Sequence, residues 1–112
     1  MGIGNILAME VRYDDDELAR IEADPDYSGG LDRPRVRAFR KLMNIVRSAA
    51  NETELYQWKG MRFEKLKGAR SHQKSLRNNI QCRVIVEIEK GNGPNNNVLV
   101  VKGIEDYHGK KQ

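Results

Sequence analysis

The sequence predicts an α+β fold in which two N-terminal helices pack on an antiparallel sheet of about four strands. Two observations carry this prediction. Between residues 33 and 50, apolar residues recur at helical spacing. After Gly60 the period changes to two, and an apolar strand closes the pattern at Val98–Ile104. At 112 residues the chain has room for one domain, 1–112, with one modest core.

The N-terminal part predicts a strand and a short helix. Residues 1–8 are weakly patterned, and we expect them to be an N-terminal extension. Glu10–Tyr13 is a candidate strand. The acidic run Asp14–Asp16 suits the positive end of a helix dipole, so a helix should start there. Leu18 and Ile21 give it one apolar stripe, and it should end before Asp24-Pro25.

A longer helix should follow a turn-rich linker at 26–30. Asp32 is the expected N-cap, with Pro34 in the first turn. We expect this helix to end at Asn51 and 53–58 to be a connector. The apolar stripe of the helix consists of Val36, Phe39, Leu42, Met43, Val46, Ala49 and Ala50. The expected packing residues of the connector are Leu55, Tyr56 and Trp58.

The second half of the chain predicts the strands. Alternation indicates a short strand at 62–67 that breaks at Gly68, a polar loop, and a strand at 74–79. In the next strand, 82–89, the even positions form the apolar face and Arg83, Ile85, Glu87 and Glu89 form the other face. Turn-forming residues at 90–97 predict a hairpin loop. The final strand is apolar on both sides and should be central or well covered. Residues 109–112 read as a polar tail.

The charges are strongly segregated, although the formal net charge is only +4. Residues 1–32 hold nine acids and two bases, whereas residues 33–50 hold six bases and no acid. Basic regions of this kind attract polyanions, and nucleic acid is the commonest one in a cell. The basic face of the second helix is equally well explained as a solvated surface or as a surface for a partner or RNA.

Several classes of function find no support. Cys82 is the single cysteine, so no disulfide framework is expected, and we expect it to be a small core residue. His72 and His108 lack zinc-site spacing, and His72 reads as a surface residue. No metal or cofactor is expected. Apolar runs are too short to span a membrane, and no signal-peptide pattern is present, so we expect a cytoplasmic location.

The stretch 62–83 is the strongest candidate for an active surface, because it carries seven bases and a single acid. Arg77 and Arg83 should lie on opposite arms of one hairpin, where two guanidinium groups can bracket a phosphate. The alternative is cross-strand pairing with Glu87 or Glu89. Lys67-Gly68 can lie along a phosphate or can be an ordinary surface turn.

The C-terminal residues Asp106, Tyr107 and His108 close the last strand. Histidine suits proton transfer near neutral pH, and tyrosine can stack on a nucleobase. The alternative for this trio is a frayed terminus.

These motifs, taken together, resemble a known family. R-F-E-K-L-K-G at 62–68, S-L-R-x-N-x-Q-x-R at 75–83 and the closing E-D-Y-H at 105–108 are similar to the HigB toxins of the RelE superfamily. The likeness spans roughly residues 9–108, behind two helices in the expected order. It implies the RelE-like fold and the toxin component of a type II toxin–antitoxin system.

The resemblance also implies an activity and its partners. Such toxins are metal-independent endoribonucleases that enter the ribosomal A site and cut the mRNA that is being translated. A helix-turn-helix antitoxin (HigA-like) neutralises the toxin, and the toxin would reach operator DNA only through it. No membrane partner is implied. Residue by residue, Lys67 matches the catalytic lysine and Arg83 the arginine after the hairpin. Asp106, Tyr107 and His108 match the terminal trio, with His108 as the proton-transfer group.

Glu64 departs from the family pattern, because many members have histidine there. It could act as a base, leave a weakened enzyme, or pair with Arg62. The alternative function is therefore a catalytically weakened or inactive module that binds the ribosome or the antitoxin without cleavage. Further basic residues of the stretch are expected RNA contacts: Arg62, Lys65, Arg70, Lys74 and Arg77. A stand-alone DNA-binding protein is disfavoured, because the Arg-rich helix has no paired recognition helix.

Overall fold

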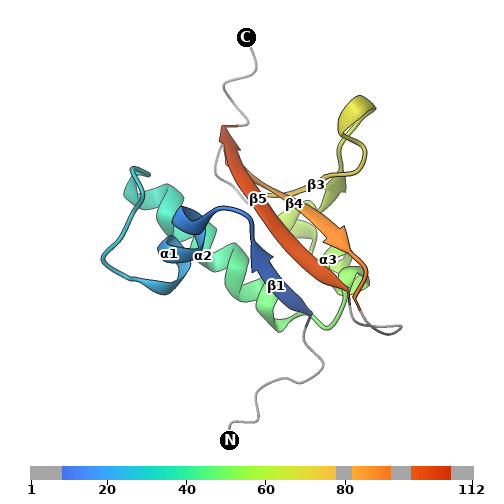
Figure 1. Cartoon of the computed structure of the whole chain (residues 1–112), viewed down its shortest axis with the longest axis horizontal. Helices are drawn as coiled ribbons and strands as arrows, with labels where there is room; N and C mark the ends of the chain where they lie inside the picture. The colour runs from blue at the N-terminus through green and yellow to red at the C-terminus, as the bar shows by residue number, and fades with distance from the viewer. Residues whose placement is uncertain (1–8, 78–81, 92–96, 107–112) are drawn as a thin grey trace, which may run out of the picture.

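A computed structural model describes residues 9–77, 82–91 and 97–106, and for Cys82 and Asp106 it describes the backbone. The fold is α+β, with a five-stranded mixed sheet and three α-helices among these residues (Figure 1). Along the sheet the strand order is β1-β5-β4-β3-β2. The strands are β1 (Glu10–Tyr13), β2 (Glu64–Lys65), β3 (Lys74–Leu76), β4 (Cys82–Glu89) and β5 (Val98–Asp106).

The prediction of a purely antiparallel sheet of about four strands was wrong. β1 adds a fifth strand, and it pairs with β5 in parallel, from Glu10 opposite Val98 to Tyr13 opposite Val101. The other three pairings are antiparallel. A four-residue strand shows in its sequence neither its neighbour nor its direction, so only the tertiary arrangement could decide this point. β5 is an interior strand, flanked by β1 and β4, and its residues 98–101 are buried, so the prediction that it is central or well covered is confirmed.

The first two helices form where the sequence predicts them. α1 (Asp16–Ala23) begins after Asp15, whose side chain accepts a hydrogen bond from the backbone N–H of Glu17. α2 (Arg33–Ser48) begins after Asp32, whose side chain caps the N–H of Arg35. Pro34 stands in the first turn, where a missing N–H costs nothing.

A third helix, α3 (Glu52–Gln57), occupies the stretch expected to be a connector. α2 ends at Ser48, and Asn51, expected as its end, instead caps α3 by accepting a hydrogen bond from the N–H of Glu54. Six residues make fewer than two turns, too few for a helical period to show in the sequence. Leu55 is fully buried, as predicted. Tyr56 is 49% exposed, but its ring packs against Phe63, with the ring centroids 4.6 Å apart. Trp58 is also 49% exposed and is not the packing residue that we expected.

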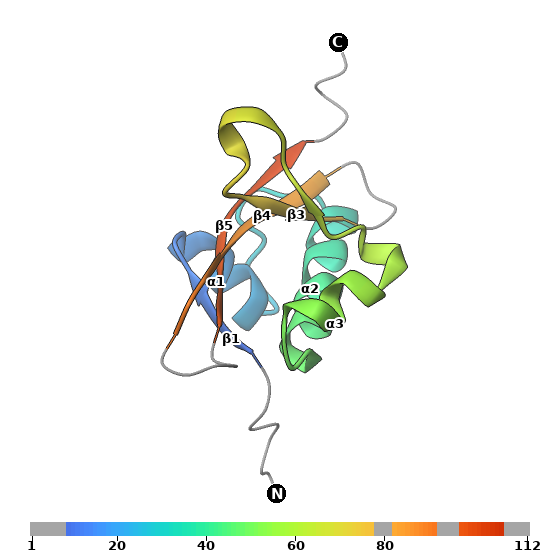
Figure 2. The same cartoon turned by 90° about the vertical axis from the view of Figure 1, so that its right-hand side faces the viewer.

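The core lies between one face of the sheet and the helices. Figure 2 shows α2 and α3 on the same side of the strands. The predicted stripe of α2 is buried there, and Phe39 is only 2% exposed. From the sheet, the central strands contribute Val84 and Val86 of β4 and Leu99 and Val101 of β5. The predicted face of β4 is therefore confirmed for its described side chains. Ala50 is only partly buried.

Candidate functional site

The stretch 62–77 begins with a run of short elements at the edge of the sheet. Arg62 is the only non-glycine residue with a positive φ among the described residues, with φ of 48°. The predicted strand at 62–67 shrinks to β2, and the predicted strand at 74–79 shrinks to β3, with 78–81 outside the described residues. Between them the chain makes a short 3-10 turn, Gly68–Arg70, after Lys67.

Gly68 explains how this connection reverses. Its φ is +68°, a left-handed conformation that glycine adopts without the penalty that a Cβ imposes. The reversal is closed by hydrogen bonds from the N–H of Leu66 to the carbonyl of Gln73 (2.9 Å) and from the N–H of Gln73 to the carbonyl of Arg70 (2.8 Å). Strand alternation ends at Lys65, so it does not determine where the side chain of Lys67 lies.

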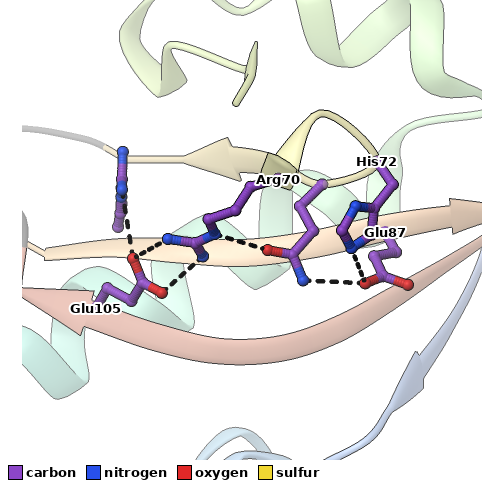
Figure 3. Close-up of polar contacts among 6 residues, drawn as sticks. Arg70, His72, Glu87 and Glu105 are labelled. Atoms are coloured by element: carbon purple, nitrogen blue, oxygen red, sulfur yellow. Dashed lines mark hydrogen bonds and ion pairs between the residues drawn. The ribbon is translucent and has the colours of Figure 1, made fainter. Parts of the chain in front are cut away.

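From this turn, Arg70 reaches the far side of β4. Its guanidinium donates two hydrogen bonds to the carboxylate of Glu105 on β5, at 3.2 and 2.7 Å (Figure 3). The same carboxylate accepts a third hydrogen bond from Nη2 of Arg83 at 3.3 Å. Arg70 belongs to the turn between β2 and β3, so this contact joins that turn to β5 on one face of the sheet.

A β-bulge in β5 puts Glu105 on this face. Ile85 pairs with Gly103, but the next residue, Val86, pairs with Val101, so Lys102 is an extra residue without an opposite partner. A one-residue insertion exchanges the two faces of a strand beyond it. Without it Glu105 would share the phase of Leu99 and Val101 and point into the core. With it, Glu105 lies directly across from Arg83, on the face opposite the core.

This outer face carries a continuous set of polar contacts, which we call the Glu105 network. Nε of Arg70 donates to Oε1 of Gln73 (3.1 Å), and Nε2 of Gln73 donates to Oε2 of Glu87 (3.0 Å). Nε2 of His72 lies 3.6 Å from the same Glu87 oxygen, an ion pair whenever the imidazole is protonated. The members of the network are Arg70, His72, Gln73, Arg83, Glu87 and Glu105.

The carboxylate of Glu105 is held in its charged form. The hydrogen bonds from Arg70 make the largest contribution and lower the pKa of Glu105. Burial raises this pKa by a smaller amount, and the charge of Arg70 and the contact with Arg83 lower it further. In turn, Glu105 raises the pKa of Arg70. Arg83 has the most enclosed side chain of the three, 20% exposed against 42% for Arg70 and 39% for Glu105. Two guanidinium groups share the carboxylate of Glu105, and the carboxylate of Glu87 balances the second positive charge of the network.

The structure therefore brings together Arg70 and Arg83, two of the predicted site residues, through a residue to which no role was assigned. The cross-strand partner of Arg83 is Glu105 rather than Glu87 or Glu89, which were the expected alternatives. A basic residue opposite an acidic residue in paired strands is the signal for such a contact. The sequence did not show that Arg83 and Glu105 face each other, because the position of the bulge determines which residues of β4 and β5 are paired.

Glu64 lies on the same outer face. It pairs with Ser75, Ser75 pairs with Ile85, and Ile85 pairs with Gly103, so the four residues form one row across the sheet. Glu64 and Lys67 are both exposed. Among the described residues, Glu64 has no side-chain hydrogen bond or ion pair, so pairing with Arg62, one of the three alternatives for this residue, is absent there.

Lys74 lies away from this group. It pairs with Val86, a core residue, so its side chain points to the helix side of the sheet. There Nζ contacts the carboxylate of Glu52 and lies 5.4 and 5.5 Å from the ring centroids of Tyr56 and Phe63. Burial lowers the pKa of Lys74, but its contacts with Glu52 and Tyr56 outweigh burial and raise it overall.

The remaining predicted residues are Arg62, Lys65 and Arg77, and the terminal trio. Arg62 and Lys65 are exposed, and the N–H of Arg77 bonds to the carbonyl of Met61 at 2.6 Å. Asp106 ends β5 opposite Cys82, directly beside Arg83 in the neighbouring strand. Tyr107 and His108 lie outside the described residues.

No cluster of three or more histidine, cysteine, aspartate or glutamate side chains suited to a metal ion occurs within the described ranges. None of the helices described is long and apolar enough to cross a membrane. Comparison of the chain with models of protein families, with curated protein sequences and with solved structures finds no match.

Proposed function

We propose that this chain is a HigB-like toxin of the RelE superfamily, a ribosome-dependent and metal-independent endoribonuclease that cuts translated mRNA. The observation that carries the proposal is the convergence of Arg70 and Arg83 on Glu105 at the end of β5. The α+β fold with helices on one face of the sheet is compatible with it. The sequence motifs at 62–68, 75–83 and 105–108 supply the chemical roles.

In the proposed reaction the 2′-hydroxyl of one nucleotide attacks the adjacent phosphate. The 2′-O–P bond forms, the P–O5′ bond breaks, one proton leaves the 2′-oxygen and one proton reaches the 5′-oxygen. Lys67, Arg83 and Arg70 would stabilise negative charge on the phosphate. His108 would transfer a proton, with Asp106 and Tyr107 beside it. Arg62, Lys65 and Arg77 would contact RNA or ribosomal RNA.

The proposed partners are the ribosomal A site with its mRNA and a helix-turn-helix antitoxin. The resemblance and the basic surface support them. Lys74 is assigned a structural role in place of an RNA contact, because Glu52 neutralises it on the helix side of the sheet.

The test is expression without any antitoxin, followed by growth measurement and mapping of transcript ends. The chain should arrest growth and cut mRNA on ribosomes, and Lys67→Ala or His108→Ala should reduce cleavage by about 100-fold or more. Lys41→Ala, an exposed lysine outside the stretch, is the matched control and should cleave normally. Undiminished cleavage by both site variants would refute the assignment of these residues.

The second candidate is a module that binds the ribosome or the antitoxin without cleaving mRNA. Glu64 favours it, because a carboxylate stands where many relatives of the proposed family have histidine. Under this alternative, expression leaves transcripts intact while the protein still sediments with ribosomes. Cleavage gained by Glu64→His would then assign the loss of activity to this one position.

A further inference from the structure

The basic face of α2 divides into residues that are engaged and residues that are not. Arg35 pairs with Asp32 at 2.6 Å, and Arg47 pairs with Glu22 at 2.6 Å. Arg40 has a different role, because its guanidinium donates to three backbone carbonyls. These are the carbonyls of Ile21 (2.8 Å), Asp24 (2.9 Å) and Tyr27 (3.2 Å).

Three bases of the same helix are left over: Arg33, Arg37 and Lys41. Within the described part of the chain, none of them makes a side-chain hydrogen bond or ion pair. All three are exposed. Arg33 and Arg37 are one helical turn apart, so their side chains emerge on the same side of α2, with Cβ atoms about 6 Å apart.

Arg33 and Arg37 share a pocket of about 560 Å³ between α2 and the loop that follows α1. Its size lies within the usual range for small-molecule sites, about 300–1,000 Å³. The lining also includes an apolar wall and an acidic residue: Tyr27, Leu31, Val36 and Asp26.

The wall of this pocket is fixed in place. Arg40 ties the end of α1 and the loop to α2 through the three carbonyls. The loop then turns back through Gly29 and Gly30, with φ of +60° and +86°. A Cβ on Gly29 would lie 2.9 Å from Cδ1 of Ile21, so this glycine also allows the loop to pack closely on α1.

We propose that this pocket binds a small organic phosphate, a phosphorylated sugar or nucleoside. Two guanidinium groups one turn apart suit a phosphate, which accepts paired hydrogen bonds from arginine. Leu31, Val36 and the part of the Tyr27 ring that the guanidinium of Arg20 does not cover offer apolar surface to the organic part. The carboxylate of Asp26 repels the phosphate from its own part of the pocket and can accept a hydrogen bond from a sugar hydroxyl. The site is independent of the proposed ribonuclease function, because it uses none of its residues.

The experiment is a titration followed by NMR, in which the backbone amides of the ¹⁵N-labelled full chain report the place of binding. The probes are adenosine 5′-monophosphate, ribose 5-phosphate, adenosine and inorganic phosphate, each at low ionic strength. The variants are Arg33→Gln and Arg37→Gln. Lys41→Gln is the matched control, since Lys41 is equally exposed on the same helix but does not line the pocket.

Both organic phosphates should give saturable shifts confined to residues 25–40, and adenosine should give none. Each arginine variant should weaken binding about tenfold, the effect of losing one charge-assisted contact. The control should bind as the parent does. Thermal unfolding of all three variants shows whether they are folded.

Three results would overturn the proposal. One is the absence of saturable binding by either organic phosphate in the folded parent protein. Another is an equal loss in the Lys41 variant or shifts spread over the basic surface, because general electrostatic attraction then explains binding. The last is equal affinity for inorganic phosphate and both organic phosphates, because the apolar wall then contributes nothing.

Discussion

Replacing Glu105 with glutamine tests whether the Glu105 network holds the outer face together. The substitution keeps the shape of the side chain and removes the charge that Arg70 and Arg83 share. Exposed ion pairs contribute about 0.2–1 kcal/mol, and hydrogen bonds to charged groups that are less exposed contribute about 1.5–3 kcal/mol. The side chains of Arg70 and Glu105 are about two-fifths exposed, so the energy of their ion pair should lie near the range for exposed pairs. The side chain of Arg83 is more enclosed, so its hydrogen bond to Glu105 should contribute more.

We therefore expect Glu105→Gln to lower the free energy of unfolding by about 1–2 kcal/mol at pH 7. For a domain of this size that corresponds to a fall in Tm of about 4–8 °C. Thermal unfolding followed by circular dichroism measures it. Glu89→Gln is the matched control, because Glu89 holds Arg12 in a pair that is about half exposed on both sides. Loss of this single exposed pair should cost at most about 0.2–1 kcal/mol, so Tm should fall by less than it does in Glu105→Gln.

The pH dependence gives a second test of the same reasoning. The folded protein has a lowered pKa at Glu105, so the stabilisation is fully present above the unfolded value of about 4.3. It is lost as the pH falls through the lower, folded value. The difference in Tm between the parent and Glu105→Gln should therefore shrink in acid. A difference that is absent at pH 7, or that grows as the pH falls, would refute the role assigned to this carboxylate.

Three further changes test the local arguments by thermal unfolding. Lys74→Met should destabilise by about 1–3 kcal/mol, because Glu52 loses its partner in a half-buried site, and RNA binding should not change. Gly29→Ala should lower the free energy of unfolding by more than the roughly 1–2 kcal/mol that a left-handed backbone costs a residue with a Cβ. Gly30→Ala is its control, because a Cβ there meets open space, and it should destabilise less. Equal effects of the two changes would contradict the close packing of the loop. Asp32→Ala should cost about 1 kcal/mol through loss of the α2 cap, and an unchanged Tm would contradict that role.

The sequence was sufficient for those parts of the fold that local chemistry determines. Asp15 and Asp32 cap α1 and α2, and α2 buries the predicted stripe. β4 alternates as expected over its described side chains. In each case the capping residue or the repeated apolar pattern lies within one helix or strand, so the local sequence is enough to predict where that element begins and which face it buries.

The sequence did not determine the features that depend on distant pairing. The parallel pairing of β1 with β5 joins segments more than eighty residues apart. α3 is too short for a period, and the exposure of Trp58 depends on where that helix ends. Lys74 looked like one more base of a cationic stretch. Its register opposite Val86 turns it toward Glu52 instead.

The bulge at Lys102 is a local feature of β5 that determines a distant contact. Its sequence, Val-Lys-Gly-Ile, offers only the isolated Gly103 as a sign, since a glycine inside a strand often marks a bulge. The bulge decides that Glu105 meets Arg83 rather than the core. A phosphate that binds to Arg70 and Arg83 must then compete with a carboxylate already bound to both. If these arginines serve the proposed ribonuclease, Glu105→Gln should weaken the fold and at the same time raise the affinity for single-stranded RNA. If the network is purely structural, the same change should weaken the fold and leave RNA affinity as it was. Stability and RNA affinity, measured on this one variant, therefore distinguish two roles for the network. In one role RNA displaces the Glu105 carboxylate from the two arginines, and in the other the contacts only tie the β2–β3 segment to β5.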